Sequence, residues 1–147
     1  DAIIENLGKK PSSFTAASYK TDKPLQLPPY QRKAPKTKEL VGADLFVHWP
    51  GTNPDELAER LKSLNDGQVE LSMITNRGIK VWPEGFPETF CTDHWRCRFK
   101  PKGSHAMSKQ QIIRLLQEAE AKSIDCIKTE NLYAFDGRPA FSLGQGQ

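Results

Sequence analysis

The chain has 147 residues, of which 37% are hydrophobic and 27% charged, so it can fill one modest core and is predicted to form one compact domain with a tail. The formal net charge is +3, but residues 1–40 hold eight Lys/Arg and four Asp/Glu, whereas residues 41–147 hold thirteen and fourteen. The later part is nearly neutral, which disfavours a dedicated nucleic-acid-binding domain, because phosphate binding needs concentrated Lys/Arg.

Cysteine usage and hydropathy favour a cytoplasmic protein. Cys91, Cys97 and Cys126 are too few, and odd in number, for the disulfide framework of a secreted protein. No run approaches the roughly 18 apolar residues of a membrane span, and no signal peptide is visible. We therefore expect a reducing cytoplasmic location and no membrane partner.

Residues 1–8 (DAIIENLG) have the pattern of a helix end, with Ile3, Ile4 and Leu7 on one side and Gly8 at the C′ position. A helix of about seven residues is not stable alone in water. We therefore expect that the chain was cut from a longer one, and that the missing part covers these apolar residues. Residues 9–39, rich in Pro and Lys, are expected to be an extended linker.

From residue 40 onward the pattern becomes regular. Apolar and polar residues alternate over residues 41–49, as in a half-buried strand. In the next segment, PGTNPDELAERLKSLNDG, Thr52 or Asn53 can cap a helix that begins at Pro54 and is closed by Gly67. The expected buried stripe of that helix is Leu57, Leu61 and Leu64.

A hairpin and a second helix follow. In VELSMITNRGIKVW, Val69, Leu71 and Met73 alternate before a turn at residues 76–78. The segment DHWRCRFK is another strand, Ser108 and Gln111 form a capping box for the helix KQQIIRLLQEAEAK, and residues 124–135 are the last strand. The order predicts the α+β class with a ferredoxin-like split β-α-β-β-α-β sandwich: an antiparallel sheet with two helices on one face, over residues 40–136, before a tail at 137–147.

Cys91, His94 and Cys97 are spaced like loose metal ligands, but an extended strand would separate the two cysteines by roughly 20 Å. His94 would also face away from Cys97, because side chains alternate along a strand. Only a loop around Cys91 would rescue a metal site, so a buried structural Cys97 is favoured.

The same alternation predicts a polar outward face, with Trp95, Cys97 and Phe99 in the core. An RNA-recognition domain shares this plan but places stacking aromatic residues on the central strand, where this chain has His and Arg. We therefore expect the face to be covered by another domain or subunit, as a polar interface. The candidate interface residues are Asp44, Phe46, His48, His94, Arg96 and Arg98 on the sheet, with Ile3, Ile4 and Leu7 at the start of the chain.

No phosphate-binding fingerprint is present, and serine–histidine–acid sets built on His94 or His105 are no better than chance pairings. Catalytic, cofactor-binding and metal-binding residues are therefore all predicted as none, and the chain alone is not expected to be an enzyme.

Several segments together resemble one family. The blocks AIIENLGKKP, YKTDKPLQLP, KELVGADLFV, MITNRGIKVWP, TDHWRCRF, ENLYAFDG and SLGQGQ, in this order and spacing, resemble the C-terminal extension of a bacterial, Thermus- and Rickettsia-like, isocitrate dehydrogenase. The likeness runs nearly from end to end. Each block is weak alone, and the order makes the match specific.

The resemblance implies that residues 1–8 end the last helix of the dehydrogenase catalytic domain. It further implies a parent enzyme that oxidatively decarboxylates isocitrate to 2-oxoglutarate with NADP or NAD and Mg²⁺ or Mn²⁺, as a homo-oligomer, with all catalytic groups outside this chain. The implied partners are the catalytic domain and the subunit mate. Their contact would give the chain an accessory role in oligomerisation, stability or regulation.

Two alternatives remain open at this point. By analogy of fold, the domain could be an ACT-like regulatory module that binds a small-molecule effector. RNA binding through Arg96, Arg98 and the Lys-rich linker is a further, less favoured interpretation.

Overall fold

The computed structural model describes residues 1–19, 25–64 and 67–144, in two compact units, residues 1–34 and 35–147. Part of the predicted linker (residues 20–24) and the end of the predicted tail (residues 145–147) lie outside the described residues.

The first unit contains one short helix, α1 (Ala2–Glu5), whose first turn is capped by Asp1: its side chain accepts a hydrogen bond from the Ile3 amide at 3.2 Å. Gly8 has a φ of +80°, as expected for a residue that ends a helix. Ile3, Ile4 and Leu7 at this helix end are all exposed, and among residues 1–19 and 25–34 no apolar side chain is buried.

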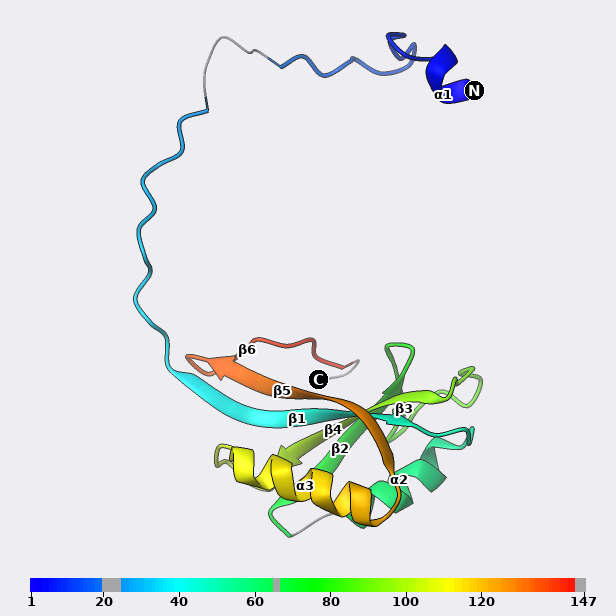
Figure 1. The fold of residues 1–147 in the computed structure, drawn as a ribbon, viewed down its shortest axis with the longest axis vertical. Coiled ribbons are helices and arrows are strands. Elements are labelled where there is room, and N and C mark those ends of the chain that lie inside the picture. Colours follow the sequence, from blue (N-terminus) through cyan, green and yellow to red (C-terminus); the bar gives the residue numbers. More distant parts are fainter. Residues whose placement is uncertain (20–24, 65–66, 145–147) are drawn as a thin grey trace. The chain divides into compact units, whose positions relative to one another are not determined.

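The second unit is a six-stranded antiparallel sheet with the strand order β3-β2-β4-β1-β5-β6. Figure 1 shows helices α2 and α3 on one face of this sheet, with the chain after β6 on the opposite face. The predicted α+β class with an antiparallel sheet is therefore confirmed. The elements are β1 (Lys38–His48), α2 (Pro54–Lys62), β2 (Val69–Asn76), β3 (Ile79–Trp82), β4 (His94–Pro101), α3 (Lys109–Ala121), β5 (Asp125–Phe135) and β6 (Arg138–Pro139).

Local signals begin the helices and the hairpin where the sequence predicts them. Asn53 is the N-cap of α2, and its side chain accepts a hydrogen bond from the Asp55 amide at 3.0 Å. Ser108 and Gln111 form both hydrogen bonds of the predicted capping box of α3. The β2–β3 turn places Arg77 and Gly78 at φ values of +52° and +82°, the geometry of a two-residue hairpin turn.

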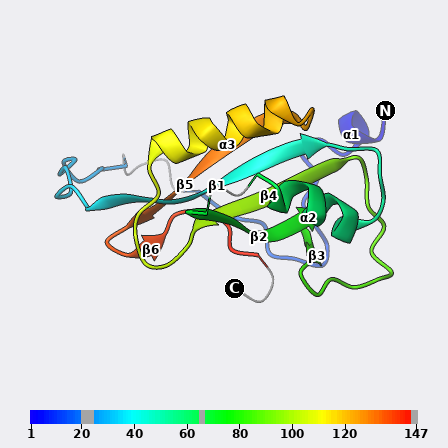
Figure 2. The same cartoon turned by 90° about the horizontal axis from the view of Figure 1, so that it is seen from below.

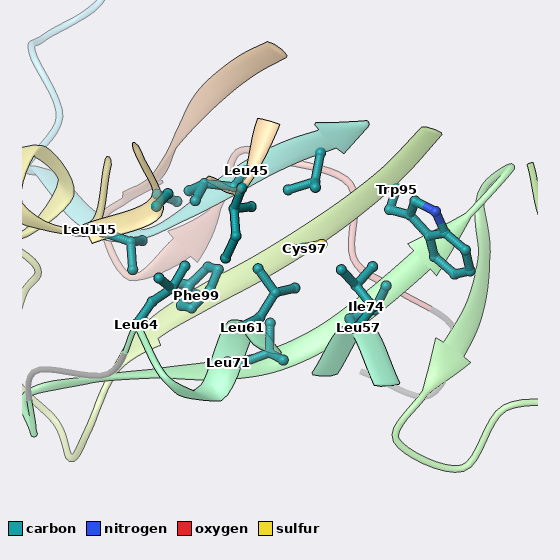
Figure 3. Packing of buried hydrophobic residues seen from close by; sticks show 14 of the residues in the cluster. Leu45, Leu57, Leu61, Leu64, Leu71, Ile74, Trp95, Cys97, Phe99 and Leu115 are labelled. Carbon is teal, nitrogen blue, oxygen red and sulfur yellow. The ribbon is translucent and has the colours of Figure 1, made fainter. Parts of the chain in front are cut away.

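The core lies between the sheet and the two helices. Figure 2 views the sheet from the side on which α2 and α3 lie. Trp95, Cys97 and Phe99 all point into the core and are fully buried, which confirms the predicted alternation along β4. They pack with the leucines of α2 and α3, as Figure 3 shows. Burying a large apolar side chain stabilises a fold by about 1.5–3 kcal/mol, so this layer supplies most of the driving force for folding.

One residue of β2 departs from the predicted alternation. Leu71 pairs with Phe99, but a bulge follows it, so that Met73 pairs with Arg98 and Ile74 with Cys97. Ile74 therefore belongs to the core, and Met73 is buried on the opposite face of the sheet. The alternation of Val69, Leu71 and Met73 in the sequence therefore does not place all three side chains on one face, because one extra residue in a strand reverses the faces of the side chains that follow it.

Candidate interface on the outer sheet face

The outer face, which is the sheet face away from the helices, carries two neighbouring rows of side chains. Strand pairing aligns the residues of each row, because directly paired residues share a face. The covered row is Met73, Arg98, Asp44 and Glu130, on β2, β4, β1 and β5. The open row is Lys80, Thr75, Arg96, Phe46 and Lys128, on β3, β2, β4, β1 and β5.

The centre of the covered row is a buried ion pair. Arg98 donates from Nε to Asp44 Oδ1 and from Nη2 to Asp44 Oδ2, both at 2.8 Å, and both residues are only 1% exposed. This is the bidentate geometry in which a guanidinium binds a carboxylate most strongly. Neither charge is therefore presented to solvent.

The C-terminal segment, residues 138–144, covers this row. It begins in β6, where the Ala140 amide donates to the Tyr133 carbonyl at 2.9 Å. Farther along, Arg98 Nη2 donates to the Ser142 carbonyl at 3.0 Å, and the Arg98 guanidinium lies 4.9 Å from the Phe141 ring centroid. The predicted tail thus begins with the strand β6 and then crosses the outer face of the sheet (Figure 1), where it contacts Arg98 of the ion pair.

The open row differs in charge and, apart from Thr75, which is only 2% exposed, it is open to solvent. Arg96 approaches Asp44 Oδ2 at only 3.5 Å, and its buried Nε has no hydrogen-bond partner among the described residues. Lys128 lies 4.6 Å from the Phe46 ring centroid and forms a 2.5 Å ion pair with Glu130 of the covered row. The row itself contains three cations, a hydroxyl and an aromatic ring, but no carboxylate.

A pocket of about 340 Å³ opens on the outer face beside Arg96. Phe46 and His94 form one of its walls, with ring centroids 5.7 Å apart in an edge-to-face arrangement. The β2–β3 turn contributes Arg77, which has no acidic partner within 4.0 Å in the described ranges. Cationic groups and aromatic rings together make this pocket suited to a carboxylate with an apolar neighbour.

His48 lies at the end of β1, apart from the pocket. Its Nε2 is 3.4 Å from Asp93 Oδ2, and its Nδ1 is 3.4 Å from Asp125 Oδ2. The imidazole thus bridges the start of β4 and the start of β5, and all three side chains are about half exposed or more.

The structure brings only part of the predicted interface together. Asp44 and Arg98 are buried beneath the C-terminal segment, while Arg96 and Phe46 are partly exposed and His48 and His94 are exposed. Ile3, Ile4 and Leu7 lie in the separate first unit. Sequence reasoning missed Thr75, Lys80 and Lys128, which strand register alone adds to the open row.

The three cysteines are free thiols with different surroundings. Burial raises the pKa of the Cys97 thiol far above its ordinary value, and the nearby Cys126 and Asp44 raise it further. Burial also raises the pKa of Cys91 and, more than any other influence, that of Cys126. Cys97 faces the core while His94 faces solvent, so the predicted divergence of these two potential ligands is confirmed.

Across residues 1–19, 25–64 and 67–144, no helix has both the length and the apolar character needed to cross a membrane. Within the same ranges, no group of three His, Cys, Asp or Glu side chains is arranged to hold a metal ion.

Comparison with known proteins identifies the family. Residues 38–147 match the family model described as bacterial isocitrate dehydrogenase, C-terminal domain. The whole chain is 34% identical to part of isocitrate dehydrogenase [NADP] of Rickettsia bellii, and 35% identical to part of the enzyme of the same name from Thermus thermophilus. It spans 31% and 30% of the length of these relatives.

The fold has a solved counterpart as well. A crystal structure of a Thermus thermophilus protein, 34% identical in sequence, superposes with a TM-score of 0.73 over 99% of this chain and 30% of that one. Family model, sequence relatives and structure agree, so the resemblance seen in the sequence is confirmed. The chain belongs to the bacterial isocitrate dehydrogenase C-terminal domain family.

Proposed function

We propose that this chain is a non-catalytic accessory domain of a longer isocitrate dehydrogenase. The relatives are named isocitrate dehydrogenase [NADP], and the chain spans less than a third of their length. The longer protein would oxidatively decarboxylate isocitrate to 2-oxoglutarate in the cytoplasm. NADP and Mg²⁺ or Mn²⁺ would bind in the part outside this chain, since no described side-chain cluster here offers a metal-ligand set.

The exposed helix end is the observation that carries the accessory role. Ile3, Ile4 and Leu7 are 76%, 67% and 73% exposed, on a helix of four residues that cannot be stable in isolation. Apolar residues at such a helix end are stabilised only when another surface covers them. We assign that surface to the catalytic domain, whose last helix would end at residues 1–8.

The domain division follows from the same proposal. Residues 9–39 would be the linker, residues 40–136 a ferredoxin-like domain and residues 137–147 its tail. The strand order β2-β4-β1-β5, with helices after β1 and β4, supports the ferredoxin-like plan, and β3 and β6 extend its two edges. The strand β1 begins at Lys38, close to the proposed boundary.

Deleting residues 40–147 from the longer protein tests the accessory role. We expect a lower melting temperature or a smaller oligomer in sedimentation experiments, with isocitrate oxidation retained in the catalytic part. If melting temperature, oligomeric state and kinetic constants are all unchanged, the domain has no accessory role and the proposal fails.

A point variant tests the helix end separately. The change I3D/L7D places two charges in the proposed contact and should lower the melting temperature of the longer protein. The matched control is I113D, at a half-exposed position of α3 in the other unit. Equal effects of the two variants would show that Ile3 and Leu7 have no special partner.

A further inference from the structure

We propose that the open row binds an acidic segment of a partner protein, extended across the strands, with carboxylates against Arg96 and the two lysines and an apolar side chain against Phe46. This inference rests on the proposed accessory role, and it specifies that the partner surface bound by the domain is acidic with an apolar side chain. It assigns the contact to five residues in cross-strand register: Lys80, Thr75, Arg96, Phe46 and Lys128.

The length of the row sets the length of its occupant. Five strands have four spacings of about 4.8 Å, so the row is about 19 Å long. An extended chain rises about 3.3 Å per residue, so a segment of about six residues would reach from Lys80 to Lys128. A single small anion could not contact cations spread over this distance.

Charge favours an acidic occupant. Both oxygens of Asp44 accept hydrogen bonds from Arg98, so this carboxylate leaves Arg96 with only a 3.5 Å contact. Arg96 donates no hydrogen bond from its buried Nε to any described residue, and Lys80 has no acidic partner within 4.0 Å there. Lys128 already pairs with Glu130 at 2.5 Å, so it is the weakest of the three cationic contacts offered to a partner. Nε itself is buried and out of reach of a partner, but the Arg96 side chain as a whole is 23% exposed. A partner's carboxylate would therefore bind the exposed part of this cationic side chain, and charge-assisted bonds are the stronger ones.

The ring of Phe46 favours a protein over a nucleic acid. Lys128 lies over the ring at 4.6 Å and His94 meets it edge-to-face at 5.7 Å, so the ring is already engaged by a cation and an imidazole. A base would have to displace Lys128 to stack on that side of the ring, whereas an aliphatic side chain needs only the part of the half-buried ring that is exposed. Arginine and aromatic side chains, by contrast, are enriched at the centres of protein interfaces.

Peptide binding to the 147-residue chain tests the inference. The probe is a fluorescein-labelled heptapeptide, Glu-Ser-Glu-Ser-Leu-Ser-Glu, in which the three glutamates and the leucine lie on one face when the chain is extended. Its control replaces each glutamate by glutamine. We expect the acidic peptide to bind at least about tenfold more tightly than its control at low salt, and to weaken as salt rises. No binding of the acidic peptide, or equal binding of the two peptides, would overturn the inference.

Paired variants locate the contact. Replacing the two lysines at the ends of the row, K80Q/K128Q, should weaken peptide binding about twofold to thirtyfold, since each of the two exposed charge pairs contributes about 0.2–1 kcal/mol. The control K109Q/R114Q removes the same charge from α3 and should leave binding unchanged. Equal weakening by both variants would mean nonspecific attraction, contrary to the inference.

Two competitors identify other ligand classes. A uridine hexanucleotide that binds more tightly than the acidic peptide would make the row a nucleic-acid surface. Citrate that displaces the peptide at comparable concentration would make the pocket a small-anion site. Either result would overturn the inference, whereas failure of both competitors would support it.

The peptide experiment is independent of the domain deletion. If the deletion destabilises the longer protein but the peptide does not bind, the accessory role stands and the open row is not its contact. If the peptide binds but the deletion changes nothing, the surface is real and the accessory role fails.

Discussion

The covered row and the open row lie side by side on one sheet face, and each includes an arginine of β4, yet these two arginines differ in exposure. In the covered row, Arg98 has a bidentate carboxylate partner and a carbonyl of the C-terminal segment above it. In the open row, Arg96 has one long contact to the same carboxylate and faces a pocket. Two arginines two residues apart on one strand therefore have different surroundings: Arg98 is paired and buried, and Arg96 lines a pocket.

The difference shows that cationic residues on a strand do not by themselves define an interface. Asp44 is the nearest carboxylate to both arginines, and its two oxygens satisfy only Arg98. What separates the rows is which arginine is paired and covered, and this follows from strand register and from the course of the C-terminal segment.

Breaking the buried ion pair should have the largest effect. We expect D44A to lower the free energy of unfolding by about 3–5 kcal/mol, because it leaves the Arg98 guanidinium buried without its partner. Urea denaturation followed by tryptophan fluorescence measures this change. E130Q, at the rim of the same row, is the control with little expected loss; a loss below about 1 kcal/mol in D44A would show that Arg98 does not depend on this carboxylate.

A substitution in the core should have the second-largest effect on the free energy of unfolding. C97S should cost about 1–3 kcal/mol, since it buries a hydroxyl where a thiol packs among apolar side chains. The same denaturation experiment checks this value, with C91S as the half-buried control. Equal losses in the two variants would contradict the placement of Cys97 in the core.

Thiol titration adds a pH dependence with a definite sign. The pKa of Cys97 is raised in the folded state, so the native protein holds a proton that the unfolded chain releases above its ordinary thiol pKa. The free energy of unfolding should therefore fall as pH rises above about 8.5, and this fall should be smaller in C97A. Iodoacetamide should modify Cys97 last; rapid modification of Cys97 in native protein would disprove its burial.

The C-terminal segment over the covered row should contribute less to the free energy of unfolding than the buried ion pair does. F141A should lower the free energy of unfolding by about 1–2 kcal/mol, because it removes both apolar contact and the cation–π contact with Arg98. L143A, at a position that is 51% exposed, is the matched control and should cost less than about 0.5 kcal/mol. Equal stability of both variants and the parent chain would mean that the C-terminal segment covers the row without stabilising it.

The open row should be the least sensitive. K80Q/K128Q should change the free energy of unfolding of the chain by less than about 0.5 kcal/mol, since neither lysine is buried. Thermal unfolding of the variant measures this. A loss comparable to that of D44A would show that the row stabilises the fold, and the contrast between the two rows would disappear.

Local patterns in the sequence predicted much of the fold. The caps Asn53 and Ser108 act within three residues, and the alternation of Trp95 and Phe99 depends only on strand geometry, so each is visible in a short window. The reversal at Met73 was not visible, because a bulge depends on the partner strand as well as on its own residues.

The burial of Asp44 and Arg98 beneath the C-terminal segment could not be predicted from the sequence either. Alternation correctly placed Asp44 and Arg98 away from the core, but it carries no information on what lies above them. The C-terminal segment that covers them has no periodic pattern in its sequence. Phe141 and Ser142 reach Arg98 because the Asp136–Gly137 turn directs the chain back across the sheet. Long-range contacts of this kind follow from the assembled sheet.

The strand order has a kinetic consequence. The first long strand, β1, lies between β4 and β5, which are made much later in the chain, and one hydrogen bond beside it joins Thr37 to Asp136 across 99 residues. Folds dominated by such distant pairings form slowly, on a scale of about milliseconds to seconds. The apolar residues of β1 therefore stay unpaired until β4 and β5 have been synthesised, and an unpaired apolar strand is prone to aggregation during that time.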